Sequence, residues 1–136
     1  MRDRRVFEAQ RSRIPEVMAF VEGFAEHVGL HPKLGMQLQL AVEEAVVNIC
    51  DYAYETPPGE VEVCLEQDGD RLTLELRDEG VPFDPLAVDA PDRQAGLDDR
   101  KLGGLGIFLI GKVVDEVRYR REEGVNVLTM RLANPR

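Results

Sequence analysis

The first stretch of the chain with apolar residues at the three- and four-residue spacing of an amphipathic helix follows Ser12. Serine is a residue type that caps helices, and Pro15 and Glu16 suit a first helical turn. The pattern stops at Gly29, which predicts the end of this helix. Its apolar stripe contains Ile14, Val17, Val21, Phe24, Ala25 and Val28.

A second helical pattern begins at Pro32 and continues to about Tyr54. Proline is favoured in the first turn of a helix, and the run TPPG at residues 56–59 stops the pattern. The sequence therefore predicts a second amphipathic helix, longer than the first. Its buried stripe is predicted to contain Leu34, Leu38, Ala41, Val42, Ala45, Ile49 and Ala53.

Apolar and charged residues alternate in the middle and at the end of the chain, as in half-buried strands. In the middle, residues 61–66 and 72–76 predict two strands joined by a turn at residues 68–70. At the end, strands around Val117 and Thr129 are predicted to join at Glu123 and Gly124. A weaker alternation over residues 5–10 suggests one further strand.

The segment from Asp78 to Gly104 is rich in Pro, Asp and Gly, which predicts a loop. Loops of about 25 residues in a compact domain are usually functional or mobile. Residues 104–114 then predict a short apolar helix. The resulting order is strand, two helices, hairpin, long loop, helix and hairpin. It predicts an α+β two-layer sandwich, in which helices cover one face of a mixed, mostly antiparallel sheet.

Composition narrows the class of protein. The chain has 136 residues, which fits a single domain over residues 1–136, and 43% of them are hydrophobic. Asp and Glu number 26 against 17 Lys and Arg, so the net charge is −9. This balance argues against generic binding of nucleic acid or anionic membranes, and it suits a basic protein partner or a magnesium-nucleotide site.

Compartment and redox state follow from the same composition. No apolar run approaches the about 20 residues that a membrane span needs. The charged start, MRDRRVFEAQ, is not followed by an apolar signal segment, so a cytoplasmic protein is expected. Cys50 and Cys64 lie in apolar patterns, where two reduced core thiols are favoured over one buried disulfide.

The second predicted helix carries a carboxylate and an amide one turn apart. Glu44 and Asn48 share a face, and Asp51 lies on nearly the same side. An amide oxygen can bind a hard cation such as magnesium, and a carboxylate can deprotonate a hydroxyl or water. The same spacing is also typical of an ordinary solvated helix face.

A second candidate is the segment Asp78-Glu79-Gly80 directly after a predicted strand. A carboxylate here could accept a hydrogen bond from the exocyclic amine of a base, and Gly80 would let another group approach closely. A plain turn is the alternative.

A third candidate is the glycine-rich run Gly103-Gly104-Leu105-Gly106 at the start of the short helix. Free backbone N–H groups at a positive helix end can bind phosphates, although a flexible hinge fits the same residues. Residues 106–112 match most of a phosphate-loop pattern, but position 113 is Val where a magnesium-binding hydroxyl is needed. A true phosphate loop is therefore disfavoured.

Two other groups are interpreted without function. His27 and His31 are four apart, but Gly29 lies between them, so a metal site is disfavoured. Arg118, Arg120 and Arg121 are interpreted as the solvent-facing side of a strand.

The three candidate motifs occur in an informative order: Glu44-Ala45-Val46-x-Asn48, then Asp78-x-Gly80, then Gly104-x-Gly106. This order resembles the ATPase superfamily of gyrase, heat-shock chaperone and histidine kinases. The runs DEGVPFDP at 78–85 and GGLGI at 103–107 are most similar to the anti-sigma-factor serine kinase family. The resemblance extends over nearly the whole chain.

This resemblance implies a Bergerat-type fold that binds ATP and Mg²⁺, with a lid loop at about residues 78–104. It implies that Glu44 activates a serine hydroxyl, that Asn48 binds magnesium, and that Asp78 binds the adenine amino group. The implied partners are an anti-sigma-antagonist domain that accepts phosphate on serine and a sigma factor; the sequence leaves open whether the chain also forms a homodimer. The implied ATP-binding set is Asn48, Asp51, Asp78, Gly80, Lys101, Gly103, Gly104, Leu105 and Gly106.

Two departures from the family pattern bear on catalysis. Leu102 stands where these kinases often carry Arg before the glycine box, and Lys101 is a point charge without the planar fork of Arg. The segment Gly124-Val125-Asn126 stands where the family tends to have Gly-Thr, so an expected hydroxyl contact is absent. Leu102 motivates an alternative function, a nucleotide-gated module that sequesters a sigma factor or other regulator without transferring phosphate.

Overall fold

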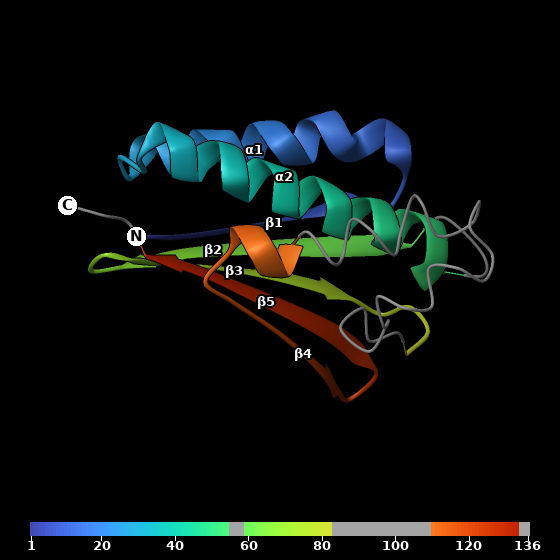
Figure 1. Ribbon diagram of the computed structural model, residues 1–136. Coiled ribbons are helices and arrows are strands. Elements are labelled where there is room, and N and C mark those ends of the chain that lie inside the picture. Colours follow the sequence, from blue (N-terminus) through green and yellow to red (C-terminus); the bar gives the residue numbers. More distant parts are fainter. Residues whose placement is uncertain (55–58, 83–109, 134–136) are drawn as a thin grey trace.

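The computed structural model describes residues 1–54, 59–82 and 110–133, and in them two helices cover one face of a five-stranded sheet (Figure 1). The strand order is β1-β2-β3-β5-β4, and each of the four pairings is antiparallel. The α+β two-layer fold expected from the sequence is confirmed. Its elements are β1 (Arg2–Glu8), α1 (Ile14–His27), α2 (Pro32–Asn48), β2 (Glu60–Asp68), β3 (Arg71–Asp78), β4 (Glu116–Glu122) and β5 (Val125–Ala133).

The start of α1 differs from the prediction. Residues 11–13 form a 3₁₀ turn, and Arg13, not Ser12, occupies the position before the helix, without a side-chain cap. The prediction of a Ser12 cap is wrong because the 3₁₀ turn already gives the Ile14 N–H a partner, the carbonyl of Arg11, and Pro15 has no N–H to donate. The end of α1 is as predicted, because Gly29 has a φ of +70° just beyond it.

Helix α2 begins at Pro32 as predicted, and the Nδ1 atom of His31 accepts a hydrogen bond from the backbone N–H of Lys33 at 3.1 Å. Its α-helical part ends at Asn48, and a π-helical turn continues the helical path over Ile49–Ala53. Apolar spacing cannot distinguish the two helix types at a helix end. Single π turns occur frequently at functional sites, and this turn lies close to the candidate residues on α2.

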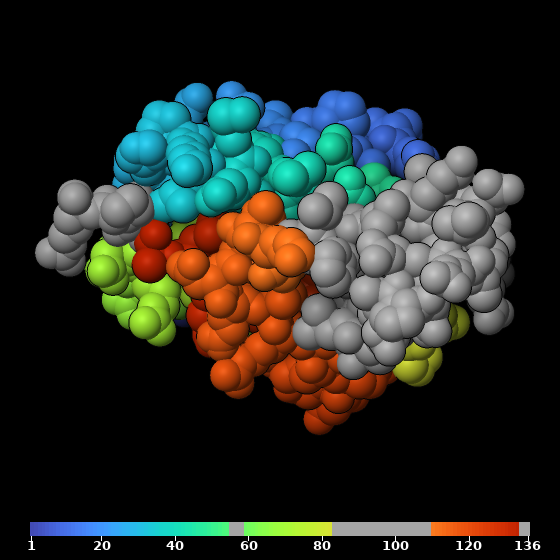
Figure 2. Space-filling model, viewed as in Figure 1, coloured from blue at the N-terminus to red at the C-terminus, as the bar shows by residue number. Residues whose placement is uncertain are grey.

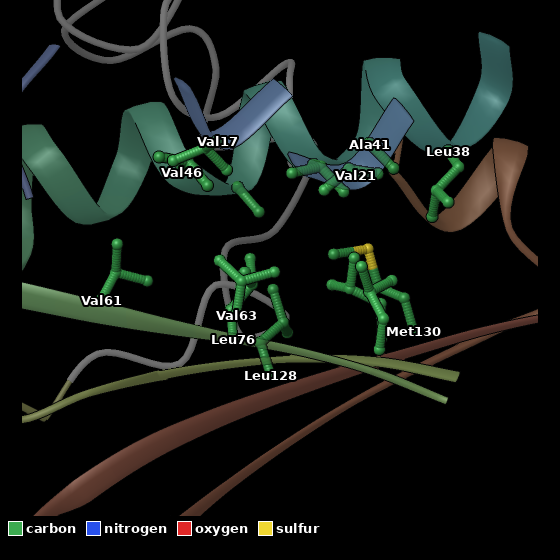
Figure 3. Close-up of a cluster of buried hydrophobic side chains, with 14 of the residues drawn as sticks. Val17, Val21, Leu38, Ala41, Val46, Val61, Val63, Leu76, Leu128 and Met130 are labelled. Atoms are coloured by element: carbon green, nitrogen blue, oxygen red, sulfur yellow. The ribbon is translucent and has the colours of Figure 1, made fainter. Parts of the chain in front are cut away.

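The core lies between the two helices and the sheet (Figure 3). Both hairpins have the predicted turns, and Gly69 and Gly124 adopt positive φ angles there. The alternation of β2 and β3 places one apolar row of each strand against the helices. Side chains labelled in the core are Val17, Val21, Leu38, Ala41, Val46, Val61, Val63, Leu76, Leu128 and Met130.

The other face of the sheet carries charged residues that form cross-strand ion pairs, such as Arg2 with Glu66 and Arg4 with Glu62. Cys64 lies on this face and is half-buried. Cys50 is half-buried as well, and both thiols are free. The expectation of free thiols is confirmed; Cys50 packs against the core, as expected, whereas Cys64 lies on the outer face. Burial raises the pKa of both thiols to about 11, so they are protonated at neutral pH.

Only part of the predicted long loop and short helix can be compared with the structure. Residues 110–113 are helical, and Ile110 and Val114 are buried in the core. Residues 83–109 lie outside the described residues, and so does most of the predicted lid loop. Within the described segments, no helix is both long and apolar enough to cross a bilayer.

Candidate functional site

The carboxylate and amide predicted on the second helix lie in its last two turns. Asn48 is 4% exposed, and its Nδ2 donates a hydrogen bond to the backbone carbonyl of Glu44 at 2.7 Å. This bond fixes the orientation of the amide: the nitrogen faces the helix backbone, and Oδ1 lies on the other side of the amide group. An amide oxygen is one of the oxygen ligands that a hard cation can take.

Glu44 is only partly buried, so its carboxylate is accessible to a reactant. Partial burial raises its pKa, and the neighbouring charge of Glu43 raises it further. A carboxylate with a raised pKa is a stronger proton acceptor than an ordinary glutamate. The residue is therefore suited to the role of general base.

Asp78 ends β3 on the face of the sheet that carries the core residues. It is 6% exposed, and its Oδ1 accepts two hydrogen bonds, from the Gly80 N–H at 3.0 Å and from the Nδ2 of Asn126 at 2.9 Å. Burial raises the pKa of Asp78, whereas these two bonds and the charge of Arg121 lower it. A buried carboxylate with both of these bonds on one oxygen can offer the other oxygen to a ligand.

Gly80 is required by a close approach between two backbones. A Cβ atom at this position would lie 2.2 Å from the carbonyl oxygen of Ala53, much closer than atoms can approach. The same carbonyl accepts a hydrogen bond from the Val81 N–H at 2.7 Å. The turn after Asp78 thus packs directly against the π-helical end of α2, which brings the Asp78 segment to the same end of the helix as Glu44 and Asn48.

Three residues of the β4–β5 hairpin complete this arrangement, and the sequence had given them no such role. Asp78 and Asn126 are cross-strand partners on β3 and β5. The Oδ1 of Asn126 accepts hydrogen bonds from the Tyr119 hydroxyl at 2.5 Å and from Arg121 at 3.1 Å. Arg121 also donates to the Gly80 carbonyl at 2.7 Å.

Arg118 and Arg120 lie on the outer face, as interpreted, and pair with glutamates there. Arg121 is exposed too, but its assignment to the same face as Arg118 and Arg120 is wrong. Arg121 falls on the other side of β4 by alternation, together with Val117 and Tyr119. That alternation was the available signal, but the run of three arginines over 118–121 obscured it.

The remaining predicted site residues divide into two groups. Asp51 forms a two-bond ion pair with Arg11, at 2.9 and 2.6 Å, so its carboxylate already has a partner within the protein. Lys101, Gly103, Gly104, Leu105 and Gly106 lie outside the described residues, as does Leu102. Among the residues that the structure describes, no cluster of three or more His, Cys, Asp or Glu is arranged to hold a metal ion.

Comparison with known proteins identifies the family. The family model described as "Histidine kinase-like ATPase domain" matches residues 7–132. The chain belongs to this family. The matched range includes all of the site residues placed above, from Glu44 to Asn126.

Individual relatives narrow the comparison within the ATPase family. The serine/threonine-protein kinase BtrW of Bordetella bronchiseptica is 32% identical over 111 residues, which cover 77% of this chain and 78% of BtrW. The serine-protein kinase RsbW of Staphylococcus epidermidis is 34% identical over 95 residues, which cover 65% of this chain and 60% of RsbW. The resemblance to anti-sigma-factor kinases within the ATPase family is confirmed.

The fold of this chain is similar to that of a solved structure that contains an RsbW domain. The structure of the RsbU and RsbW domains of Rv1364c from Mycobacterium tuberculosis has a TM-score of 0.71 and 16% sequence identity to this chain. The match covers 100% of this chain and 33% of that one. At this identity the likeness supports the histidine kinase-like ATPase fold.

Proposed function

We propose that this ATPase domain is an ATP-dependent serine kinase of the anti-sigma-factor type, acting in a partner-switching pathway. The observation that carries the proposal is the buried Asp78 carboxylate, fixed through one oxygen, at the same end of α2 as Glu44 and Asn48. An adenine base recognised by Asp78 would extend its phosphates along this end of the helix. The kinase relatives BtrW and RsbW support the same conclusion.

In this proposal each described residue has one task. Asp78 accepts a hydrogen bond from the adenine amino group, and Gly80 leaves room for the turn that positions it. Asn48 Oδ1 would bind magnesium, which supplies charge neutralisation on the phosphates. Glu44 accepts the proton of the serine hydroxyl as that oxygen attacks the terminal phosphorus, and the bond from this phosphorus to the bridging oxygen breaks, so that ADP leaves. Phosphoryl transfer depends mainly on such positioning and charge.

The phosphate contacts in the proposal come from sequence. Backbone N–H groups of Gly103, Gly104, Leu105 and Gly106 would bind the phosphates, and Lys101 would contribute a positive charge. Asp51 stays a predicted member of the ATP-binding set. Because its carboxylate is paired with Arg11, we propose that it holds the end of α2 in place and does not contact ATP directly. The lid loop at about 78–104 and the single domain over 1–136 stay predictions as well.

The exposed surface beside Glu44 suits an acceptor domain. Met36 is 75% exposed and Leu40 is 40% exposed, and they lie one turn apart on the side of α2 that leads to Glu44. A protein partner typically covers about 800 Å² of surface, so a domain whose serine reaches Glu44 would also cover these side chains. Figure 2 shows the surface of α2 beside residues 110–122.

The partners in the proposal are an anti-sigma-antagonist domain, which carries the acceptor serine, and a sigma factor. A homodimer and a cytoplasmic location are part of the same proposal. The acidic net charge of −9 suits a basic patch on a sigma factor.

The experiment is a phosphorylation assay with the full chain, ATP, Mg²⁺ and a purified antagonist domain. Phosphoserine on that domain, detected by mass spectrometry and lost with Glu44→Gln, is the expected result. A wild-type protein that binds ATP but transfers no phosphate would contradict the kinase assignment. It would favour the sequestering module that Leu102 suggests, and in that case Glu44→Gln should leave partner capture intact.

A matched variant tests the docking surface. Leu40→Lys should raise the KM for the acceptor domain and leave the Kd for ATP unchanged, because Leu40 is one turn away from the reacting atoms. Ala19→Lys on the exposed side of α1 adds the same single positive charge and is the control for the change in charge. An equal effect of both variants on KM would contradict this choice of surface.

A further inference from the structure

Asn126 has a hydrogen-bond environment that permits only one orientation of its amide. Its Nδ2 donates to two acceptors, Asp78 Oδ1 at 2.9 Å and the Val81 carbonyl at 2.8 Å. Its Oδ1 accepts from Arg121, which can only donate, and from the Tyr119 hydroxyl. Rotating the amide by half a turn would place its oxygen against two acceptors, so the orientation is fixed by chemistry.

We propose that Asn126, fixed by Tyr119 and Arg121, is a positioning residue that sets the direction of the Asp78 carboxylate and thereby determines selection of a 6-amino purine. This inference rests on the proposed nucleotide site. Both N–H donors of Asn126 and its acceptor oxygen are used within the protein. Asn126 therefore acts on the base through Asp78.

The bond from Asn126 fixes the orientation of the Asp78 carboxylate plane, and with it the direction in which the free oxygen faces the ligand. With Oδ1 engaged by Asn126 and Gly80, the carboxylate cannot rotate without losing two hydrogen bonds. Oδ2 is then the oxygen presented to a purine. An ionised Oδ2 accepts from a 6-amino group and repels a 6-oxo group, so its direction decides between adenine and hypoxanthine.

The Nδ2 group of Asn126 has two N–H donors, and it uses one for Asp78 and the other for the Val81 carbonyl. A side chain with a single hydroxyl could not donate to both. A threonine hydroxyl has one proton, so it could donate to Asp78 or to Val81, whereas Asn126 donates to both. Arg121 strengthens the same link by donating to the Gly80 carbonyl. The β4–β5 hairpin is thereby joined to residues 80–81, where the chain leaves β3.

The nucleotide experiment compares Kd values for ATP and ITP, which differ at the 6-position of the purine. The wild type should prefer ATP, and Asn126→Leu should reduce the ratio of the two Kd values by about tenfold, as expected for loss of one hydrogen bond to a charged group. Asn126→Thr should retain most of the preference. Tyr119→Phe should reduce it less than Asn126→Leu, because Arg121 still orients the amide.

A measurement on the nucleotide-free protein tests the positioning role of Asn126 separately from the proposed kinase function. NMR titration of the Asp78 carboxyl carbon in the wild type and in Asn126→Thr and Asn126→Leu follows its ionisation directly. The groups near Asp78 are Arg121 on β4, Tyr54 after α2, and Glu79 in the turn. Loss of the Asn126 bond should move the midpoint to higher pH in Asn126→Leu, because burial is then opposed by fewer donors.

The outcomes are distinct. If the wild type binds ATP selectively but Asn126→Leu keeps its selectivity and its Asp78 midpoint, the positioning role is wrong and the kinase proposal survives. If the wild type does not discriminate ATP from ITP, base recognition by Asp78 fails, and the inference fails with it. A purely structural Asn126 would lower Tm without changing either the Kd ratio or the midpoint.

Discussion

Replacing the buried Asp78 by asparagine should affect nucleotide binding and stability in opposite directions. The asparagine keeps the shape of the side chain and an oxygen that can accept from Gly80 and Asn126. The other arm of the group becomes an N–H donor, which faces the donor amine of adenine. Loss of one hydrogen bond to a charged group costs about 1.5–3 kcal/mol, so the Kd for ATP should rise about 10- to 150-fold.

Stability should change the other way because burial raises the Asp78 pKa above its usual value of 3.8. Between that value and the folded-state pKa, the folded protein binds more protons than the unfolded chain, so the free energy of unfolding falls as pH rises through this window. Asp78→Asn removes this cost. The variant should therefore have an equal or higher Tm at neutral pH, and the difference should disappear below pH 3.8.

The assay combines calorimetric titration with ATP and thermal unfolding over a range of pH. Asp3→Asn, a change of the same type at an exposed position of β1, is the control. A lower Tm with an unchanged Kd would refute the reasoning, since it would mean that Asp78 stabilises the fold and does not contact the base.

Three further predictions follow from the packing and the charges. Gly80→Ala should lower the free energy of unfolding by about 1–3 kcal/mol in chemical denaturation, because its Cβ would lie 2.2 Å from the Ala53 carbonyl oxygen; an unchanged value would show that the turn can move away. Glu44→Gln should abolish transfer and leave ATP binding intact. In the wild type the transfer rate should fall as pH is lowered through a pKa above the ordinary glutamate range, and a pH-independent rate would contradict the role of Glu44 as base. Leu76→Ala, in the centre of the core, should cost about 2–5 kcal/mol in the same denaturation experiment, and a loss below 1 kcal/mol would indicate that the core can collapse around the cavity.

The local elements of this protein follow from its sequence. Apolar spacing determined both helices, because one face of each must be buried, and alternation determined both hairpins. The turn glycines at 69 and 124 are chemically required by their positive φ angles. The exception is the start of α1, where residues 11–13 form a 3₁₀ turn and Ser12 does not cap the helix. The alternative conformations at a helix end differ little in free energy, so the sequence pattern does not determine which of them forms.

The sequence also indicated half of the candidate site. Glu44 and Asn48 are one turn apart, so any helix brings them together. Asp78 and Gly80 are local to one turn. What the sequence could not give is the pairing of β3 with β5, which joins segments 48 residues apart at Asp78 and Asn126.

The tertiary structure decided the roles of Asn126, Tyr119 and Arg121. Their contacts exist only because β5 is inserted between β3 and β4, in a register that places Asn126 opposite Asp78. Local patterns report which face of a strand is buried, but they carry no information about which distant strand lies alongside it. The helices, hairpins and single motifs were therefore set by short-range chemistry, and the surroundings of the Asp78 carboxylate were set by long-range strand pairing.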